Sequence, residues 1–535
     1  MAIREFPSNL QALRATATGA TAAQLFRRSA RIFRDRIAVT AGEQALTYGQ
    51  LDERSTRLAN ALSGFGLGRN DTLGVVSENR IEYVETLVAA AKIGATVVSL
   101  NVRLLPADMA HCLNDSGARL LMVSKGLLPA AEALRSLCPE IATFVCFDAA
   151  QGYDSYEGFL AQGSSIPPRE DLVQSGDIHT VVYTSGTTGK SKGAMLSQLC
   201  STSRAHNIAA WLELGPDDGF VGWAPLYHIG GYEHLYAVLA VGGKFANLPR
   251  AAPELLCEAI ERWKLTYTLM LPGVITDFLR VARTTPHDLD SLRVCAGYAN
   301  LLSSQVHLEF AEVMDIPFHD IFGQTETSYV ATGPIDAKAG KFNNKTAMPY
   351  MDVRLLDDDL NEVPDGSPGE FVLRGPNVCA GYLNNPQATA ELFRGGWLHT
   401  GDVLVRNPDG TFLFADRKKY LIKTGAENVY PAEVEQILAQ HEAVQEVCVI
   451  GIPDEKWGET VKAFVVLRAG KQLTLQEVSE WCRPRMAGYK KPRFVEFIQD
   501  SDLPRSVTGK IMREPLGKRP TTETQRVEAK ATVEE

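Results

Sequence analysis

The 535-residue sequence contains nine cysteines but no pair at the CxxC spacing of thiol redox and zinc sites. Scattered cysteines in an odd number argue against a disulfide framework and are typical of reduced thiols in a cytoplasmic protein. The sequence also has no excess of positive charge, because its formal net charge at pH 7 is -10. That balance argues against a broad nucleic-acid-binding face, which needs many phosphate-neutralising lysines and arginines.

Long hydrophobic runs are missing as well. No stretch reaches the ~18 consecutive apolar residues that cross a bilayer, and we expect no transmembrane segment. The first residues, MAIREFPSNL, carry charges and a proline where a signal peptide would have an apolar stretch. These absences together predict a cytoplasmic protein.

The composition that is present, 45% apolar and 22% charged residues, is that of an ordinary globular protein. In the first third, helical periodicity at 48–64 and 81–91 alternates with apolar strand patterns at 72–77 and 96–100. Further short strand candidates follow, at 269–271, 294–296 and 320–322. This alternation predicts an α/β fold with βαβ units on parallel sheets.

The pattern changes near residue 352. Residues 352–381 read as short strands between turns, which predicts a small antiparallel sheet. A helix at 432–440 and strands at 444–451 and 461–467 then predict a compact α+β unit. The segment after Pro520 is rich in Thr, Glu, Lys and Arg, and we expect it to be disordered.

The most informative stretch is YTSGTTGKSKG at 183–193, which follows an apolar strand pattern at 180–183. Glycines allow backbone N–H groups to turn inward, and hydroxyls and lysines add donors, so the stretch predicts a phosphate-binding loop. It is not a Walker loop, because Thr184 stands where that motif requires glycine. A solvated Gly/Ser/Thr linker is the alternative interpretation.

Five blocks occur in the order typical of one family: YTSGTTGKSKG at 183–193, FGQTE at 322–326, TGD at 400–402, DRKKYLIKTGAENVYPAEVE at 416–435 and PRSVTGKIMRE at 504–514. They resemble the signature blocks of the acyl-adenylate-forming superfamily, which includes acyl- and aryl-CoA synthetases, luciferases and the adenylation domains of peptide synthetases. The resemblance extends from about residue 22 to 518.

The resemblance implies a large N-terminal domain, residues 1–418, with two βαβ-type sheet subdomains and a small antiparallel β subdomain. A small mobile α+β lid domain at 419–520 would follow, with a disordered tail at 521–535. It also implies an AMP-dependent acyl- or aryl-CoA synthetase that uses ATP, Mg²⁺ and coenzyme A. Such an enzyme converts a small-molecule carboxylic acid to an acyl-AMP and then to a thioester, and we expect a monomer or a homodimer.

The same resemblance assigns roles at the nucleotide. Thr325 would bond the α-phosphate, and Glu326 would hold Mg²⁺, a cation that prefers oxygen ligands. Without the family, the Thr-Glu pair reads as a helix N-cap. The other nucleotide-binding candidates are Thr184, Ser185, Gly186, Thr187, Thr188, Gly189, Lys192, Ala299, Asn300, Gln324, Asp402 and Arg417.

Three further features of the family fall on the C-terminal region. Lys510 matches the lysine that bridges the carboxylate and the α-phosphate, and Lys419 matches the hinge. Both are otherwise ordinary solvated lysines. Gly425, Ala426 and Glu427 match the loop beside the pantetheine of coenzyme A, where Ala426 replaces a glycine of many relatives.

The acyl pocket is implied by the last group of residues. Tyr227 and His228 would gate the carboxylate end, and the remaining pocket candidates are Glu233, His234, Tyr298, Ile321, Phe322 and Gly323. His228 reads equally well as a core histidine, and Glu233 and His234 as residues that point outward.

The predicted substrate is a medium-size aliphatic, alicyclic or aryl acid. The alternatives are an enzyme that loads a carrier protein and a catalytically silent nucleotide-binding protein.

Overall fold

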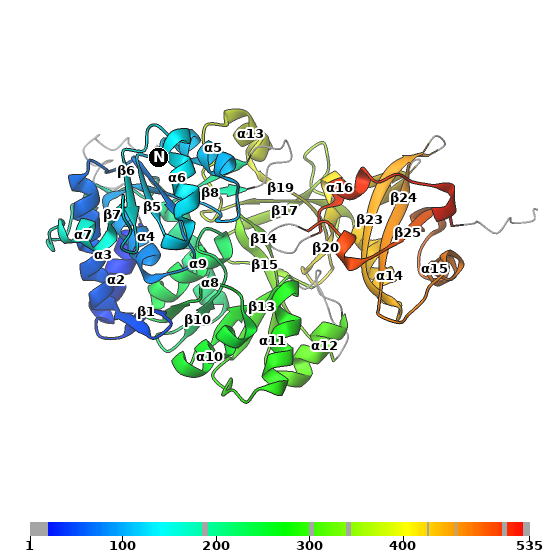
Figure 1. The fold of residues 1–535 in the computed structure, drawn as a ribbon. Coiled ribbons are helices and arrows are strands. Elements are labelled where there is room, and N and C mark those ends of the chain that lie inside the picture. The colour runs from blue at the N-terminus through cyan, green and yellow to red at the C-terminus, as the bar shows by residue number, and fades with distance from the viewer. Residues whose placement is uncertain are drawn as a thin grey trace, which may run out of the picture. The chain divides into compact units, whose positions relative to one another are not determined.

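The computed structural model describes residues 20–184, 191–298, 304–338, 344–424, 427–454, 457–505 and 511–527. The chain forms two compact units, coloured along the sequence in Figure 1. The first unit comprises the chain up to Asp352 together with Arg374–Leu398, and the second comprises Val353–Leu373 and the chain from His399 onward.

The first unit contains a seven-stranded sheet with the strand order β7-β6-β5-β3-β4-β8-β9. All neighbours in it are parallel except β8 and β9, which are antiparallel. Its strands are β3 (Thr72–Val76), β4 (Thr96–Ser99), β5 (Leu120–Val123), β6 (Thr143–Cys146), β7 (Asp154–Ser155), β8 (Ile178–Thr184) and β9 (Lys192–Ser197).

A second sheet of nine strands has the order β16-β15-β14-β13-β12-β10-β11-β1-β2. Its middle, from β14 to β1, is parallel, and antiparallel strands close both edges. Its strands are β1 (Ile37–Ala41), β2 (Gln44–Thr47), β10 (Gly219–Gly222), β11 (Lys244–Asn247), β12 (Tyr267–Leu269), β13 (Val294–Gly297), β14 (Phe318–Gln324), β15 (Ser328–Ile335) and β16 (Thr346–Ala347).

Helices cover these sheets (Figure 1). α5 and α6 supply apolar residues to a core cluster over one face of the seven-stranded sheet, while α8 contacts strands of both sheets and packs on α9. The helices are α2 (Ala22–Ile32), α3 (Tyr48–Gly64), α4 (Ile81–Ile93), α5 (Pro106–Ser116), α6 (Leu128–Leu137), α7 (Tyr156–Ala161), α8 (Gln198–Trp211), α9 (Ile229–Val241), α10 (Pro253–Trp263), α11 (Pro272–Thr284), α12 (Ser304–Val313) and α13 (Pro386–Leu392).

The predicted helix and strand boundaries of the first third agree with the structure. α3 begins after Thr47, whose hydroxyl accepts the N–H of Gln50 while the Gln50 side chain accepts the N–H of Thr47. This reciprocal capping box satisfies two donors that a helix start otherwise leaves unpaired. α4 ends at Gly94, whose left-handed φ of 71° suits glycine. The predicted α/β fold with two βαβ-type sheets is confirmed.

The second unit contains a four-stranded sheet, β17-β18-β19-β20, and a five-stranded sheet in which β22-β21-β24-β23 is extended by β25 on β24. Apolar side chains alternate between the two faces of β23 and β24 and form one core cluster on each face. The elements are β17 (Asp352–Leu356), β18 (Pro368–Arg374), β19 (Leu398–Arg406), β20 (Phe412–Arg417), β21 (Ile422–Thr424), β22 (Glu427–Val429), α14 (Pro431–Ala439), β23 (Val444–Asp454), β24 (Gly458–Leu467), α15 (Leu475–Cys482), β25 (Phe494–Ile498) and α16 (Arg513–Gly517).

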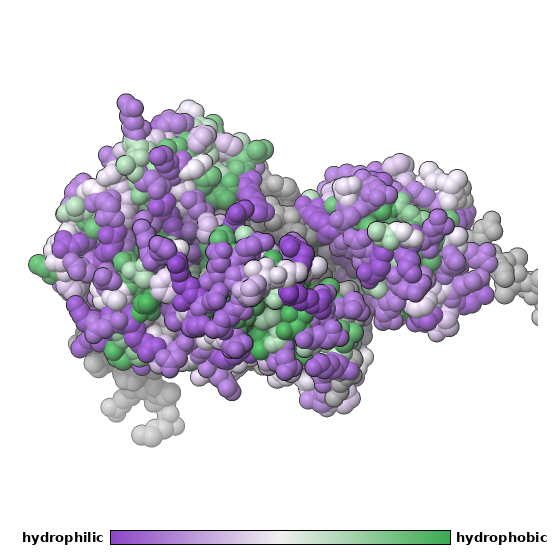
Figure 2. Space-filling view, turned by 60° about the horizontal axis from the view of Figure 1, so that its bottom comes forward, coloured by the Kyte–Doolittle hydropathy of each residue, from purple (hydrophilic) through white to green (hydrophobic). Residues whose placement is uncertain are grey.

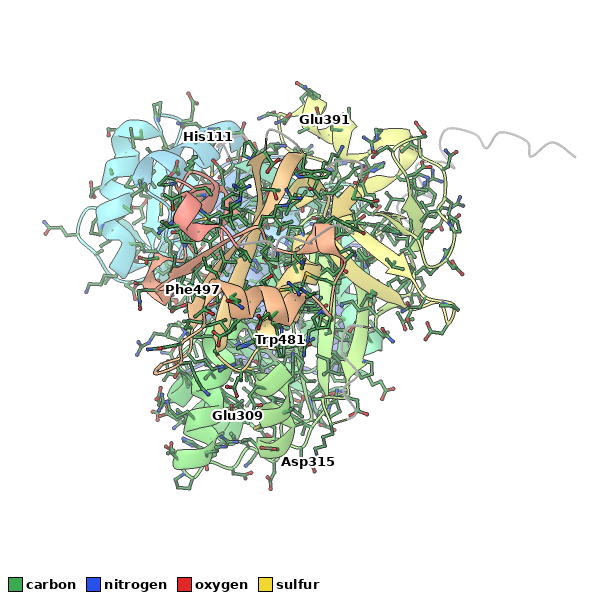
Figure 3. All side chains as sticks on the ribbon, turned by 90° about the vertical axis from the view of Figure 1, so that its right-hand side faces the viewer. His111, Glu309, Asp315, Glu391, Trp481 and Phe497 are labelled. Carbon is green, nitrogen blue, oxygen red and sulfur yellow. The ribbon has the colours of Figure 1, made fainter. Side chains whose placement is uncertain are left out.

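α15 is attached to α14 through Trp481, which is labelled in Figure 3. The indole N–H of Trp481 donates to the carbonyl of Ile437 at 2.9 Å, and its ring meets the His441 ring edge-on. This half-buried indole, hydrogen-bonded at its N–H, ties α15 to α14.

The segment 521–527 departs from the disorder predicted for it. It contains the short 3-10 helix η8 (Glu523–Gln525), Arg526 bridges to Phe494, and Val527 packs on the core of the second unit. The buried Lys462 ammonium donates to Thr521 at 3.1 Å. The composition of the tail is polar, but one buried cation and one valine hold this part of it to the sheet; residues 528–535 lie outside the described residues.

The face in Figure 2 is mostly hydrophilic, with apolar residues in small separate groups. Among the helices that the structure describes, none combines the length and the apolar character needed to cross a membrane.

Candidate active site

The predicted phosphate loop connects two antiparallel strands of the first unit. Thr184 at the end of β8 pairs with Lys192 at the start of β9, and five of the predicted phosphate ligands between them lie outside the described residues: Ser185, Gly186, Thr187, Thr188 and Gly189. Gly193 packs so closely that a Cβ there would lie 2.7 Å from the Val181 side chain. The base of the loop is therefore held by tight pairing at the carboxyl end of a parallel strand, where α/β proteins bind ligands.

Residues 379–383 run alongside β9. Met195 donates its N–H to the carbonyl of Gly381, Ala380 donates to Met195, and Leu383 donates to the carbonyl of Gly193. This segment thereby carries Tyr382 beside Lys192, and the Lys192 ammonium lies 5.2 Å from the centroid of the Tyr382 ring. Cations are attracted to the face of an aromatic ring at this distance.

The predicted α-phosphate and metal ligands occupy the turn between β14 and β15. The N–H of Thr327 donates to the carbonyl of Gln324 and closes the turn, which leaves Thr325 half-buried and Glu326 8% exposed. This is a strand-to-strand turn, so the alternative of a helix N-cap is wrong. The carbonyl of Glu326 accepts the N–H of Cys379 at 2.7 Å, which ties the turn to the segment of Tyr382.

Tyr382 connects the turn with the phosphate loop. Its hydroxyl donates to the Glu326 carboxylate at 2.7 Å, while its ring lies beside the ammonium of Lys192. Burial, followed by the Glu326 charge, raises the pKa of Tyr382, so the phenol keeps its proton and acts as a donor. An ammonium and a carboxylate are thus held on one tyrosine, beside the predicted phosphate loop.

This arrangement fits a magnesium ion that binds together with a nucleotide. Mg²⁺ usually takes one or two protein carboxylates, substrate phosphates and several waters. Within the described part of the chain no cluster of three or more His, Cys, Asp or Glu side chains forms a self-sufficient metal site. A single carboxylate at Glu326, with one oxygen oriented by Tyr382, matches that partial ligand set.

The predicted gate lies at the start of α9. His228 is the N-cap of the helix, and its Nδ1 accepts the N–H of Gly230 at 3.1 Å. Burial lowers the pKa of His228, so near neutral pH the ring is uncharged, and because Nδ1 is an acceptor the proton is on Nε2. Tyr227, just before it, is half-buried.

The predicted floor of the acyl pocket falls on β14 and on the end of β13. Ile321 is 2% exposed and stands opposite Thr332, and Phe322 is buried beside it. Gly323 admits no side chain, because a Cβ there would lie 2.0 Å from the carbonyl oxygen of Ser328. Tyr298 is half-buried, whereas Ala299 and Asn300 lie outside the described residues.

Glu233 and His234 lie inside the first unit and do not point outward, with exposed fractions of 1% and 0%. Glu233 pairs with Arg204, and its other oxygen accepts the hydroxyl of Ser328 at 2.8 Å. Burial raises the pKa of Glu233, and Arg204 opposes that rise. His234 stacks on Phe220 with ring centroids 4.5 Å apart.

The remaining candidates belong to the second unit. Asp402 on β19 is buried and stands in register opposite Arg417 on β20. Glu427 is exposed on β22. The side chains of Arg417 and Lys419 are not among those described, and Gly425, Ala426 and Lys510 also lie outside the described residues.

The sequence analysis does not identify two residues that contact the candidate site, Tyr382 and Arg204. Tyr382 lies outside the five family blocks, and its role becomes apparent only from its pairing with β9. Arg204 carried a readable signal, since it stands one helical turn from Cys200 and from Ile208, on the apolar side of α8.

The chain is similar to known proteins over most of its length. A model of the AMP-binding enzyme family matches residues 26–383, and a model of its C-terminal domain matches residues 433–510. Indoleacetate–CoA ligase of Aromatoleum aromaticum is 33% identical over 483 residues, 90% of this chain and 94% of the relative. Feruloyl-CoA synthase of an Amycolatopsis species is 35% identical over 502 residues, 92% and 97% of the two chains.

A solved structure agrees with these relatives. An anthranilate CoA ligase in complex with anthranoyl-AMP superposes with a TM-score of 0.83 at 27% identity, covering 93% of this chain and 96% of that one. The predicted enzyme class, an AMP-forming acid–CoA ligase that uses ATP, Mg²⁺ and coenzyme A, is confirmed with its family. The chain belongs to the AMP-binding enzyme family.

Proposed function

We propose that this enzyme activates an aromatic or similarly sized carboxylic acid to its acyl-AMP and transfers the acyl group to coenzyme A. The observation that carries the proposal is the contact of Tyr382 with both Lys192 and Glu326. It holds an ammonium for phosphate oxygens and a carboxylate for a metal ion on one rigid side chain, as a metal-bound nucleotide requires.

In the first step, a carboxylate oxygen of the acid attacks the α-phosphorus of ATP, and pyrophosphate leaves. Lys192 and the loop from Thr184 would bind the outer phosphates, and Thr325 would donate to the α-phosphate. Glu326 would hold the magnesium ion, which neutralises phosphate charge when it is bound. Preorganised donors of this kind stabilise the charge that develops in the transition state.

In the second step, the thiolate sulfur of coenzyme A, formed by loss of the thiol proton, attacks the carbonyl carbon of the adenylate. A C–S bond forms, and AMP leaves with the electrons of the broken C–O bond. His228 is neutral with its proton on Nε2, so it would donate to an oxygen of the bound acyl group. The proposal assigns the ribose to Asp402 and Arg417, and the pantetheine to Gly425, Ala426 and Glu427. Gln324, Ala299 and Asn300 would complete the nucleotide pocket.

The substrate class rests on two supports. The relatives named above act on indoleacetate and ferulate, and the solved neighbour binds anthranoyl-AMP. The side chain of Ile321 is buried on β14, which favours a short acid over a long acyl chain if this strand forms the pocket floor. We propose that the acyl pocket is also lined by Tyr227, His234, Tyr298, Phe322 and Gly323.

The proposed domain division places the large domain at 1–418 and the mobile lid at 419–520. Lys419 would act as the hinge, and Lys510 would reach the nucleotide in the first step only. We also propose a monomer or a homodimer in the cytoplasm. All nine cysteines are free and buried, which is compatible with a reducing compartment.

The test is a panel of aromatic, alicyclic and medium-chain aliphatic acids with ATP, Mg²⁺ and coenzyme A, read by mass spectrometry. We expect AMP, pyrophosphate and an aryl thioester. Acyl transfer to a carrier protein in place of coenzyme A would favour the carrier-loading alternative, and no AMP with any acid would favour a silent nucleotide-binding protein. In the active system, Lys192→Ala should raise the KM for ATP or lower kcat, and Lys244→Ala serves as the matched control.

A further inference from the structure

Two opposite charges are buried together in the first unit. Arg204 on α8 and Glu233 on α9 have exposed fractions of 0% and 1%, and their charged groups are 2.7 Å apart. Burying two charges costs several kcal/mol per ion, and a hydrophobic pair of similar volume is often as stable. Stability alone therefore gives no sufficient reason for this pair.

The contacts of the pair converge on one short segment. Arg204 donates from Nη1 to the carbonyl of Thr325 at 3.1 Å, and Glu233 accepts the hydroxyl of Ser328 at 2.8 Å. These two contacts lie on either side of Glu326, at both ends of the turn between β14 and β15. Because Glu233 bonds Arg204 through Oε1 and Ser328 through Oε2, one ion pair fixes both ends.

The same arginine also reaches the second support of Glu326. Its Nε donates to the carbonyl of Asn377 at 2.8 Å. Asn377 begins the segment in which Cys379 donates its N–H to the Glu326 carbonyl and Tyr382 donates its hydroxyl to the Glu326 carboxylate. Arg204 thus connects the turn that carries Glu326 with the segment that orients its carboxylate.

The backbone of the turn requires such support. Ser328 has a φ of 65°, a left-handed conformation that is unfavourable for residues other than glycine. Conformations of this kind persist where surrounding contacts determine them. The Glu233 carboxylate supplies a contact at this residue. Gly323, which stands opposite Tyr329, has no side chain and so leaves room for the Ser328 carbonyl.

We propose that the Arg204–Glu233 pair is a positioning element that holds Thr325 and Glu326 in the geometry needed for the metal-bound nucleotide. This inference rests on the proposed function of Thr325 and Glu326 in ATP binding. In this proposal the pair contacts neither the nucleotide nor the acid. It acts through the backbone of the turn and through the segment of Tyr382.

The test compares removal of the whole pair with removal of another ion pair, in which the lysine is buried and the aspartate is half-buried. The double variant Arg204→Met with Glu233→Leu leaves no unpaired charge, and Lys92→Met with Asp52→Leu is the control, since Lys92 is fully buried and pairs with Asp52 at 2.7 Å. For each double variant we would measure the Tm and the kinetics of adenylate formation. We would also measure the Kd for ATP in the absence of the acid, once with Mg²⁺ and once with EDTA.

We expect the Arg204/Glu233 variant to keep a Tm close to wild type and to lose about 10- to 100-fold in adenylate formation, as displacements of about 1 Å do in active sites. It should also lose most of the gain in ATP affinity that Mg²⁺ gives the wild type. The control should retain both the kinetics and the Mg²⁺ gain. Glu233→Gln, which keeps hydrogen-bonding atoms toward Arg204 and Ser328, should be intermediate.

Wild-type kinetics and a full Mg²⁺-dependent gain in ATP affinity in the double variant would overturn the proposal. A loss of activity no larger than the fraction of unfolded protein would overturn it as well. If the double variant fails to fold, Glu233→Gln decides by the same two measurements. Glu326→Gln separates the two levels of the argument. If Glu326→Gln also leaves the Mg²⁺ gain intact, the assignment of Glu326 fails; if it abolishes the gain while the pair variants do not, only the positioning role fails.

Discussion

The hydroxyl of Tyr382 donates a hydrogen bond of 2.7 Å to the carboxylate of Glu326. The two residues are far apart in the sequence and meet because 379–383 pairs with β9 and with the β14–β15 turn. Within the described part of the chain, only one oxygen of the Glu326 carboxylate accepts a hydrogen bond, which leaves the other for a ligand, and this bond restricts the rotation of the group. The tyrosine is therefore part of the proposed metal-binding geometry.

The first prediction removes this hydroxyl. Tyr382→Phe should lower the rate of adenylate formation by about tenfold and raise the Mg²⁺ concentration needed for half-maximal rate, because a charge-assisted hydrogen bond contributes about 1.5–3 kcal/mol. The ring beside Lys192 remains. Rates are measured over a titration of Mg²⁺ at saturating ATP.

Tyr156→Phe is the matched control for this change. Tyr156 donates to the buried Glu85 carboxylate at 2.6 Å. The control therefore deletes the same phenolic hydroxyl at a position that contacts neither Lys192 nor Glu326. The control should lower stability without altering the Mg²⁺ dependence. An identical Mg²⁺ titration for Tyr382→Phe and the wild type would contradict the role given to Tyr382.

The order of elements was readable from the sequence because local rules and tertiary packing agree there. The capping box at Thr47 and the glycine at 94 set the boundaries of α3 and α4 within a residue or two. Sheet order was not readable. β1 lies next to β11 in the nine-stranded sheet, and nothing local to either strand encodes that pairing, because it depends on which apolar faces meet.

The candidate site was predictable where the family blocks cover it and not elsewhere. Thr325 and Glu326 were found as a motif, but the groups that orient them, Arg204, Glu233 and Tyr382, come from three other segments. The sequence marks Glu233 as a polar residue on an apolar helix and offers it as a candidate for the acyl pocket. The structure supplies a partner for it, Arg204 on the adjacent helix, and only the packing of α8 on α9 reveals that partner.

The second prediction concerns acid stability. Burial lowers the pKa of His179 to about 4 and that of His234 to about 3, below the ~6.5 of an unfolded histidine. Below pH ~6.5 these histidines bind more protons in the unfolded chain than in the folded one. Their contribution to the free energy of unfolding is therefore full above pH ~6.5 and is lost as the pH falls toward 4. Each histidine should contribute a slope of about 1.4 kcal/mol per pH unit in this window.

Urea denaturation at several pH values between 7.5 and 5 measures this slope. Comparing wild type with His234→Gln cancels the contribution of the buried carboxyl groups, which both proteins share. The variant should be less stable at pH 7.5 but lose stability less steeply on acidification. Parallel curves for the two proteins would mean that His234 is not held neutral by the fold.

The third prediction concerns Ile321. If its side chain limits the acyl pocket, Ile321→Ala should lower the KM for acids with a bulkier aromatic group while costing about 2–5 kcal/mol of stability, as other large-to-small core substitutions do. Ile260→Ala, at a fully buried position of α10, is the control for stability. A loss of stability with no change in the range of acids would identify Ile321 as core packing.

The last prediction separates the two half-reactions. Lys510 would neutralise the carboxylate and the α-phosphate during adenylation, and the loop at 425–428 would serve thioester formation, so the proposed lid must present a different face in each step. Lys510→Ala should slow adenylate formation by about 10²–10³-fold, the cost of removing one preorganised donor, and should still convert prepared acyl-adenylate and coenzyme A to thioester at close to the wild-type rate.

Lys419→Pro, which restricts the backbone at the proposed hinge, should retain adenylation and impair thioester formation. Each half-reaction is measured alone for both variants, by pyrophosphate release and by thioester formation from the adenylate. Equal losses of the two steps in Lys510→Ala would contradict the alternation, because a residue that acts in only one step cannot slow both.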